Sequence, residues 1–323
     1  MKTSSKFFRG AVAFSITIGL FMFLLSTIDF VKVLAVLKTA DRFFLFLGFF
    51  TLIFGNLLLD AFRWKVILQY LQYPVSFKEA LFIKIVSTVL ISSLPLKSGE
   101  LSRLVYLKRL KGIPYSKTTL SIVAEYGCRI FTLFFCLCIG FVWRFFENQQ
   151  QGLTVDLSHS SLILFSLCFF KWDMDSATAG RWEEQCRAAF QNNFQEFYDL
   201  LKNKIVLLAT LLYSASDIMV FYWLARSLSL DIPVSAMLIF LPIILVISCL
   251  PFTIAGLGSR ELAIVFFFQP YAPPEFLWSL GILYSVAEFA LPFFIAGTVT
   301  AIFSDKMINF FGEQKSKTEI THE

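Results

Sequence analysis

Charged residues and histidine are scarce in this sequence. Only 16% of its 323 residues are Asp, Glu, Lys or Arg, and 2 are His. A water-soluble domain usually carries about 25% charged residues, and 40 phenylalanines would leave such a domain with large exposed apolar patches. Together with 57% hydrophobic residues and a mean hydropathy of +0.71, this composition predicts an all-α polytopic membrane protein.

Motifs for metals, nucleotides and nucleic acids are missing as well. The 6 cysteines form no CxxC pair, so neither a zinc site nor a disulfide framework is indicated. The sequence contains no P-loop, no dinucleotide fingerprint and no Ser/His/Asp triad, and we expect no cofactor and no metal. The basic residues behind the net charge of +5 flank apolar runs, so we expect no nucleic-acid partner.

Several apolar runs are long enough to cross a bilayer, which takes about 20 residues. The first follows a basic N-terminus without a cleavage site and is predicted to be a retained signal anchor. A further run, Ser160–Trp172, is apolar but short, and Asp29–Arg42 has the mixed composition of an interfacial helix. The predicted full spans are Ala11–Ile28, Phe43–Phe62, Thr118–Trp143, Ile205–Ala225 and Phe276–Phe303.

Two clusters of proline, glycine, glutamate and arginine interrupt apolar sequence about 155 residues apart. They are Leu94–Arg103 and Leu250–Glu261, and each follows an apolar arm too short to cross comfortably, Ala80–Leu94 or Ala236–Leu250. Charges beside helix breakers are costly in lipid unless protein or a wet cavity surrounds them. We therefore predict two re-entrant helical hairpins among about 6–8 membrane helices.

The basic residues also predict the orientation of the chain. If basic segments face the cytoplasm, both termini are cytoplasmic, and the two hairpins enter from opposite faces as an inverted repeat. This topology requires residues 160–172 to cross the membrane. It gives one integral membrane domain over 1–312, with a first half (1–170), a cytoplasmic amphipathic insertion (171–204) and a second half (205–312), followed by a disordered tail (313–323) in a multi-pass inner-membrane protein.

The hairpins supply the first candidate binding residues. Glu100 and Arg103 are spaced to share one helix face, whereas the adjacent Arg260 and Glu261 should point apart. An arginine fork suits phosphate oxygens, and amides at the helix starts could assist it. The alternative is that each Arg–Glu pair is a structural clamp. The glycines that would permit the turns are Gly99, Gly256 and Gly258.

Other ionisable residues lie within the predicted spans, where they are functional candidates by default. Glu125 and Arg129 are four residues apart, the favourable spacing for a helical ion pair. Asp217 and Glu288 each lie midway through a span and are candidate proton or cation sites. Asp60 with Arg63 lies near a span end, where the pair is interpreted as interfacial anchoring.

At these residues the sequence resembles the flippase-like domain family, which includes the membrane region of lysylphosphatidylglycerol synthases. Leu94–Arg103, with Glu125 about two dozen residues later, is similar to the first family signature. Leu250–Glu261 is similar to the second. The family usually shows Glu-Arg and then Asp where this chain has Glu125–Arg129, so the resemblance carries no role onto that stretch.

The resemblance implies a fold with two inverted hairpins and a role in moving or binding lipids or lipid-linked sugars. We expect no aminoacylation, because the chain has no room for the synthases' soluble transfer domain. The expected partner is a phospholipid or a polyprenyl-linked lipid, bound between the hairpins of a flippase-like protein. The alternatives are a membrane-embedded glycosyl transferase and an accessory subunit of a lipid-modifying enzyme. The sequence leaves the lipid, the direction of movement and the oligomeric state open.

Overall fold

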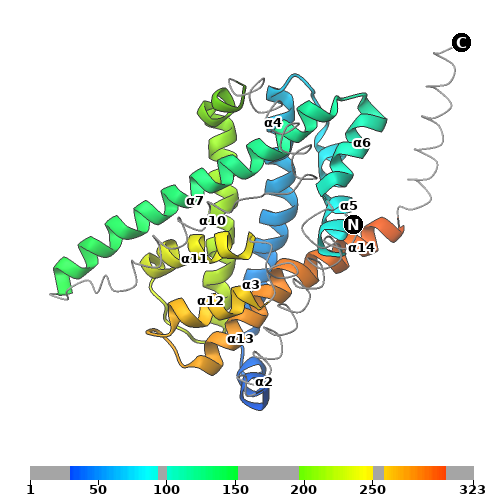
Figure 1. Cartoon of the computed structure of the whole chain (residues 1–323). Helices are drawn as coiled ribbons and strands as arrows, with labels where there is room; N and C mark the ends of the chain where they lie inside the picture. Colours follow the sequence, from blue (N-terminus) through cyan, green and yellow to red (C-terminus); the bar gives the residue numbers. More distant parts are fainter. Residues whose placement is uncertain (1–29, 94–99, 152–195, 250–257, 303–323) are drawn as a thin grey trace, which may run out of the picture.

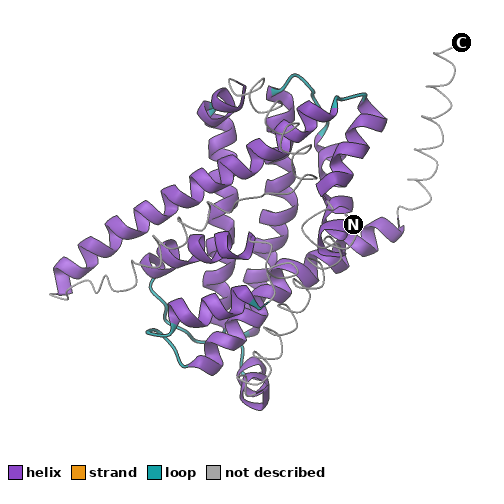
Figure 2. Ribbon diagram, viewed as in Figure 1, coloured by secondary structure: helices purple, strands orange, loops and turns teal. Residues whose placement is uncertain are grey.

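The computed structural model describes residues 30–93, 100–151, 196–249 and 258–302. Helices account for nearly all of this part of the chain, and it contains no strand (Figures 1 and 2). The helices are α2 (Phe30–Lys38), α3 (Arg42–Leu52), η1 (Ile53–Leu59), α4 (Asp60–Tyr70), α5 (Phe77–Ser93), α6 (Leu101–Lys111), α7 (Tyr115–Gln151), α10 (Lys204–Ser227), α11 (Val234–Cys249), α12 (Ser259–Phe268), α13 (Pro274–Ser285), η5 (Val286–Ala290) and α14 (Leu291–Ile302).

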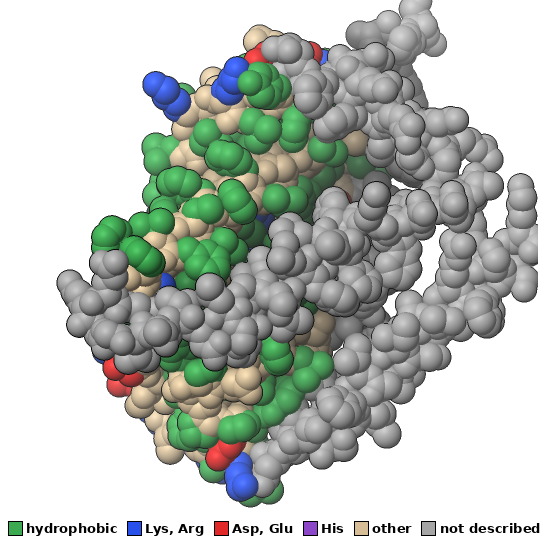
Figure 3. Space-filling model, turned by 60° about the vertical axis from the view of Figure 1, so that its left-hand side comes forward, with side chains coloured by type: hydrophobic (Ala, Val, Ile, Leu, Met, Phe, Trp, Pro, Cys, Tyr) green, Lys and Arg blue, Asp and Glu red, His purple; other side chains and the backbone are tan. Residues whose placement is uncertain are grey.

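Four helices within the described residues are long and apolar enough to cross a membrane. They extend over Arg42–Tyr70, Tyr115–Glu147, Lys204–Ser227 and Pro274–Ile295, and they overlap four of the predicted spans. Hydrophobic side chains cover much of the described surface in Figure 3, as expected for a lipid-facing exterior. The all-α polytopic membrane fold is therefore confirmed.

Several predicted segments lie outside the described residues. These are Ala11–Ile28, Ser160–Trp172, most of the insertion 171–204 and the tail 313–323. The predicted interfacial segment Asp29–Arg42 does contain a helix, α2, which packs against α13 through Val33 and Trp278. Its position at a membrane surface stays a prediction.

Polar caps determine where two of the membrane helices begin. The Asp41 side chain accepts the N–H of Phe43 at the start of α3, and Asn203 accepts the N–H of Ile205 at the start of α10. Such caps satisfy amides that the first helical turn leaves without partners. The N–H of Asp41 also donates to the carbonyl of Ser227, where α10 ends. This bond fixes α3 antiparallel to α10, and the two helices pack along their length.

The predicted hairpin arms are helices that pack in pairs. α5 contacts α6, and α11 contacts α12. In Figure 1 the α5–α6 pair lies at the upper right, and the α11–α12 pair lies at the lower left. The tips that join the arms, 94–99 and 250–257, lie outside the described residues. Re-entry of the hairpins into a membrane stays a prediction.

Three helix boundaries repeat along the chain with an offset of 157 residues. The end of α4 corresponds to the end of α10, the start of α5 to the start of α11, and the end of α6 to the end of α12. The corresponding boundaries are Tyr70 and Ser227, Phe77 and Val234, and Lys111 and Phe268. The same offset pairs identical residues in the sequence: Asp60 with Asp217, Gly99 with Gly256, and Arg103 with Arg260.

The main apolar core lies around α10, which packs against α3, α4, α7 and α13. Phe221 on this helix contacts Phe268 and Tyr284, with ring centroids 5.1 and 5.5 Å apart. Gly55 in η1 lies against Ser216, and a Cβ at this glycine would collide with the serine side chain. The glycine therefore allows the close approach of η1 to α10. π-helical segments such as η1 and η5 are frequent near functional sites.

Candidate functional site

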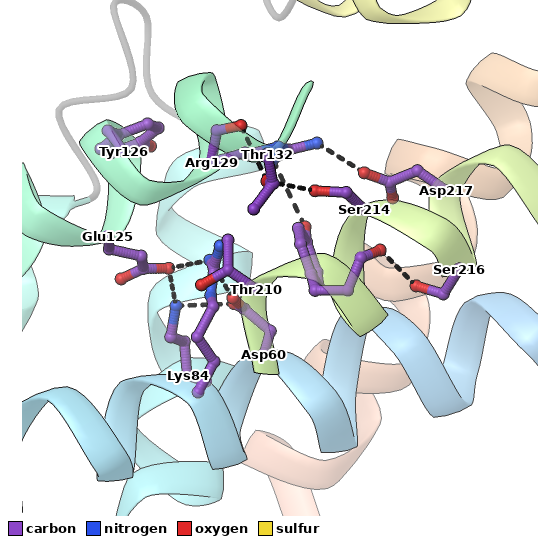
Figure 4. Close-up of polar contacts among 12 residues, drawn as sticks. Asp60, Lys84, Glu125, Tyr126, Arg129, Thr132, Thr210, Ser214, Ser216 and Asp217 are labelled. Carbon is purple, nitrogen blue, oxygen red and sulfur yellow. Dashed lines mark hydrogen bonds and ion pairs between the residues drawn. The ribbon is translucent and has the colours of Figure 1, made fainter. Parts of the chain in front are cut away.

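Glu125 on α7 is the centre of a buried group of ion pairs. It is 5% exposed, and its carboxylate lies 2.5 Å from Arg63 on α4, 2.5 Å from Lys84 on α5 and 2.7 Å from Arg103 on α6. Each of the three cations is 2–3% exposed. Figure 4 shows Glu125 and Lys84 pointing toward one another, with Asp60 beside them. Four helices thus bring charges together from four separate places in the sequence.

Two further carboxylates balance these charges. Asp60 lies 2.5 Å from Arg63 and 2.6 Å from Lys84. Glu100 lies 2.7 Å from Arg103. The hydroxyl of Tyr126 donates to Glu100 at 2.9 Å. We call the six charged residues Asp60, Arg63, Lys84, Glu100, Arg103 and Glu125 the Glu125 cluster; it contains three cations and three carboxylates.

An aromatic side chain, Trp64, lies beside two cations of this cluster. Lys84 and Arg103 lie 5.8 and 5.3 Å from the ring of Trp64, which is fully buried. The Trp64 indole donates to Ser121 at 3.3 Å, and this contact fixes the ring between α4 and α7. Dry surroundings strengthen each ion pair but raise the cost of leaving any member unpaired. The cluster is therefore stable only while its charges remain matched.

Some donors of the cluster remain unused. The Nε and Nη1 atoms of Arg63 and the Nε atom of Arg103 are buried and have no hydrogen-bond partner among the described residues. Buried guanidinium N–H groups are normally satisfied, and each one that is not costs about 1–3 kcal/mol. The cluster therefore contains buried donors that its own carboxylates do not satisfy.

A second ion pair joins the two halves of the chain. Arg129 on α7 lies 2.9 Å from Asp217 on α10, and Thr132 lies 2.9 Å from Ser214 one turn along the same two helices. Figure 4 shows both contacts. Glu125 and Arg129 were predicted to pair with each other, but their principal partners come from other helices.

Arg260 and Glu261 begin α12 and point to different partners, as predicted. Arg260 is 4% exposed, donates from Nε to Ser248 at 3.3 Å and lies 5.2 Å from the ring of Tyr284. Glu261 accepts the N–H of Gly258 at 2.6 Å and the hydroxyl of Ser285. Glu261 thus closes the first turn of its own helix, as a structural clamp would.

The geometry of Gly258 changes one sequence-based expectation. This residue has φ of 88°, which favours glycine, so it permits the turn into α12. Its amide was expected to help hold an anionic headgroup. In the structure this amide instead donates its hydrogen bond to the Glu261 carboxylate. An anion at this helix start would therefore have to displace the Glu261 carboxylate.

The structure separates the predicted site residues into groups. Glu100, Arg103 and Glu125 meet in the Glu125 cluster, and Arg129 pairs with Asp217. Glu288 lies in η5, within electrostatic range of Asp217. Gly99 and Gly256 lie outside the described residues. Among the described residues, no group of three or more His, Cys, Asp or Glu side chains could hold a metal ion.

Three functional candidates were misjudged or missed in the sequence. Asp60 and Arg63 were interpreted as interfacial anchors, which is wrong, because Arg63 is 2% exposed and binds Glu125. Lys84 was not identified at all. It is a lone lysine in the apolar arm before Leu94, and a charge at such a position is itself a signal of function.

Comparison with known proteins identifies the family. A search of curated proteins found no match. The family model described as the lysylphosphatidylglycerol synthase TM region matches residues 10–296, which include both hairpin clusters and every charged residue of the site. The chain therefore belongs to the lysylphosphatidylglycerol synthase TM region family.

Proposed function

We propose that this protein binds the headgroup of an anionic phospholipid or lipid-linked intermediate within the membrane and helps it cross between leaflets. The family relates the chain to membrane proteins of lipid modification or transport. The observation that carries the proposal is the convergence of the buried Arg63, Lys84 and Arg103 on Glu125.

The chemistry of the Glu125 cluster suits a phosphodiester. Arginine forks bind phosphate oxygens in bidentate fashion, whereas lysine acts as a compact positive charge. A phosphate oxygen can take the unused Nε or Nη1 donor of Arg63 and compete with Glu125 for the same cations. Exchanging one buried anion for another avoids an unpaired cation in the interior, which is the costly alternative.

The second hairpin completes the proposed arrangement. Arg260 would engage the phosphate on the opposite side of the membrane, while Glu100 and Glu261 hold the arginines or the helix start. Gly99, Gly256 and Gly258 would permit the turns of the hairpins. We further propose that the protein resides in the cytoplasmic membrane with both termini in the cytoplasm, since basic residues flank the apolar segments on that side.

Reconstitution into vesicles tests this function. The probe is a phosphatidylglycerol with a fluorescent label on its acyl chain, and a membrane-impermeant quencher reports the fraction that changes leaflet. The variants Arg63→Lys and Arg103→Lys keep the charge but lose the planar fork, so we expect about a tenfold slower exchange. The matched control is Arg109→Lys, an exposed arginine on α6, which should exchange lipid like the unmodified protein.

Two results would count against the proposal. If the unmodified protein moves no more lipid than protein-free vesicles, translocation is wrong. If both arginine variants move lipid at the unmodified rate, the Glu125 cluster is not the headgroup site.

A second candidate is a membrane component of a lipid-modifying or lipid-linked glycosyl transferase system; the family description, which names a lipid-modifying synthase, favours the first of these. Under that function the protein would co-purify with a lipid-modifying enzyme, or would form a product in detergent, where transport has no meaning. Autonomous lipid exchange in vesicles argues against it.

A further inference from the structure

Tyr213 on α10 lies between two arginines that belong to different ion-pair groups. Its ring is 4.3 Å from the guanidinium carbon of Arg63 and 4.9 Å from that of Arg129. Its hydroxyl accepts a hydrogen bond from Arg129 at 3.4 Å. The side chain is 7% exposed. Tyr213 was not among the residues that the sequence singled out.

Two guanidinium groups beside one ring repel each other, so each needs its own counter-charge. Arg63 has Asp60 and Glu125, whereas Arg129 has Asp217. The ring attracts both cations and keeps the two groups of ion pairs close together. Tyr213 therefore marks the boundary between the Glu125 cluster and the Arg129–Asp217 pair.

Stacking on an aromatic ring leaves the N–H edges of a guanidinium available for anions. Arg63 supports this directly, because its Nε and Nη1 atoms are buried and have no partner among the described residues. The side chain of Arg129 is more open, at 21% exposed against 2% for Arg63. A phosphate bound to Arg63 would thus lie near the more accessible guanidinium of Arg129, which stacks on the same Tyr213 ring.

We propose that Arg63 and Arg129 are two successive binding positions for the headgroup phosphate, and that Tyr213 holds them at a distance that allows direct transfer. This inference rests on the proposed function and adds a step and a residue to it. Arg63 lies on α4 in the first half of the chain, Tyr213 and Asp217 lie in the second half, and Arg129 bridges the halves. A phosphate that passes from Arg63 to Arg129 leaves the buried cluster for the contact between the two halves.

The proposal separates the rate of movement from the strength of binding. Replacing the ring by an aliphatic side chain, Tyr213→Leu, removes both cation–ring contacts but no member of the Glu125 cluster. We expect lipid exchange to slow about tenfold, while phosphatidylglycerol bound to the purified protein, measured by native mass spectrometry, changes less than about twofold. Tyr213→Phe keeps the ring and loses only the bond to Arg129, so it should restore most of the exchange rate.

Tyr222→Leu is the matched control. Tyr222 lies on the same helix, and its ring contacts Arg226, an exposed arginine near the helix end, at 6.0 Å. This variant should exchange lipid at the unmodified rate. Thermal unfolding of all variants in detergent shows whether a slower rate reflects a damaged fold.

The outcomes distinguish this inference from the proposed function. Exchange by the unmodified protein, together with unchanged exchange by Tyr213→Leu, would overturn the transfer step alone. The transfer step would also be overturned if Tyr213→Leu lowered lipid binding and thermal stability along with the exchange rate, because Tyr213 would then have a structural role. An unmodified protein without exchange would overturn the proposed function first.

Discussion

Replacing Glu125 by glutamine removes the carboxylate on which three buried cations converge. The remaining carboxylates of the cluster, Asp60 and Glu100, then face Arg63, Lys84 and Arg103, which leaves one uncompensated positive charge. Breaking a buried ion pair in this way costs about 3–5 kcal/mol. Native domains are stable by only about 5–15 kcal/mol, so the Glu125→Gln variant should unfold at a clearly lower temperature.

A second substitution restores the balance. Lys84→Met removes one cation and keeps an apolar side chain of similar length. In the double variant Arg63 retains Asp60, and Arg103 retains Glu100; each of these pairs is three residues apart on its own helix or at its start. We therefore expect the double variant to be more stable than either single variant, because both singles leave an odd charge.

The measurement is thermal unfolding in detergent, monitored as the loss of the monodisperse peak in size-exclusion chromatography. It is made on the unmodified protein, the two single variants and the double variant. The control is Glu147→Gln on the same helix, where the half-buried carboxylate lies beside Arg144 and accepts the hydroxyl of Ser235, a bond that the amide oxygen can keep; ion pairs open to solvent contribute about 0–1 kcal/mol. The charge-balance reasoning would be refuted if the loss of thermal stability in the double variant equalled the sum of the losses in the two single variants. So would a Glu125→Gln variant as stable as the unmodified protein.

Three further predictions concern single contacts. Gly258→Ala forces a side chain into a backbone with φ of 88° and should destabilise the protein by about 1 kcal/mol or more, measured by thermal unfolding. Partial burial opposes ionisation of Glu79, but hydrogen bonds from Lys111 and Ser76 outweigh it and lower its pKa below the ordinary 4.5. The unmodified protein should therefore be more stable than Glu79→Gln at neutral pH, by less than about 1 kcal/mol, and unfolding scans at several pH values should show the difference fading as pH falls below 4.5. Tyr126→Phe removes the hydroxyl that binds Glu100 and should cost about 1 kcal/mol, seen as a lower unfolding temperature with the oligomeric state unchanged.

The membrane helices could be predicted because hydropathy depends only on local sequence. The boundaries were less accurate, and this had a consequence for the site. The second span was expected to end at Phe62, but the helix continues to Tyr70 over 29 residues. Asp60 and Arg63 therefore lie inside a long helix rather than at its end, and a residue near a predicted end was taken for an interfacial anchor.

The pairing of charges could be predicted only in part. Glu100 and Arg103 are three residues apart and do pair, because local helix geometry is enough to bring them together. The i,i+4 spacing of Glu125 and Arg129 did not determine their main partners, since cations and carboxylates from α4, α5, α6 and α10 lie within reach of them. Such contacts between helices depend on packing, which a single sequence does not show.

The internal repeat indicates which charges the fold itself needs. At the offset of 157 residues, Asp60 corresponds to Asp217, but Arg63 corresponds to Val220 and Lys84 to Leu241. Both apolar counterparts are buried, at 2% and 0% exposed. The second half thus has aliphatic side chains where the first half has Arg63 and Lys84, whereas Arg103 corresponds to another arginine, Arg260.

Buried ion pairs are often replaceable by apolar residues of similar volume without loss of stability, and the second half of this chain supplies such a replacement at both positions. The extra cations of the first half are therefore not a requirement of helix packing at these positions. Their charges are balanced by the carboxylates of Asp60 and Glu125. We propose that these buried cations bind an anionic lipid headgroup, since the aliphatic counterparts in the second half show that corresponding helices pack without a cation at these positions.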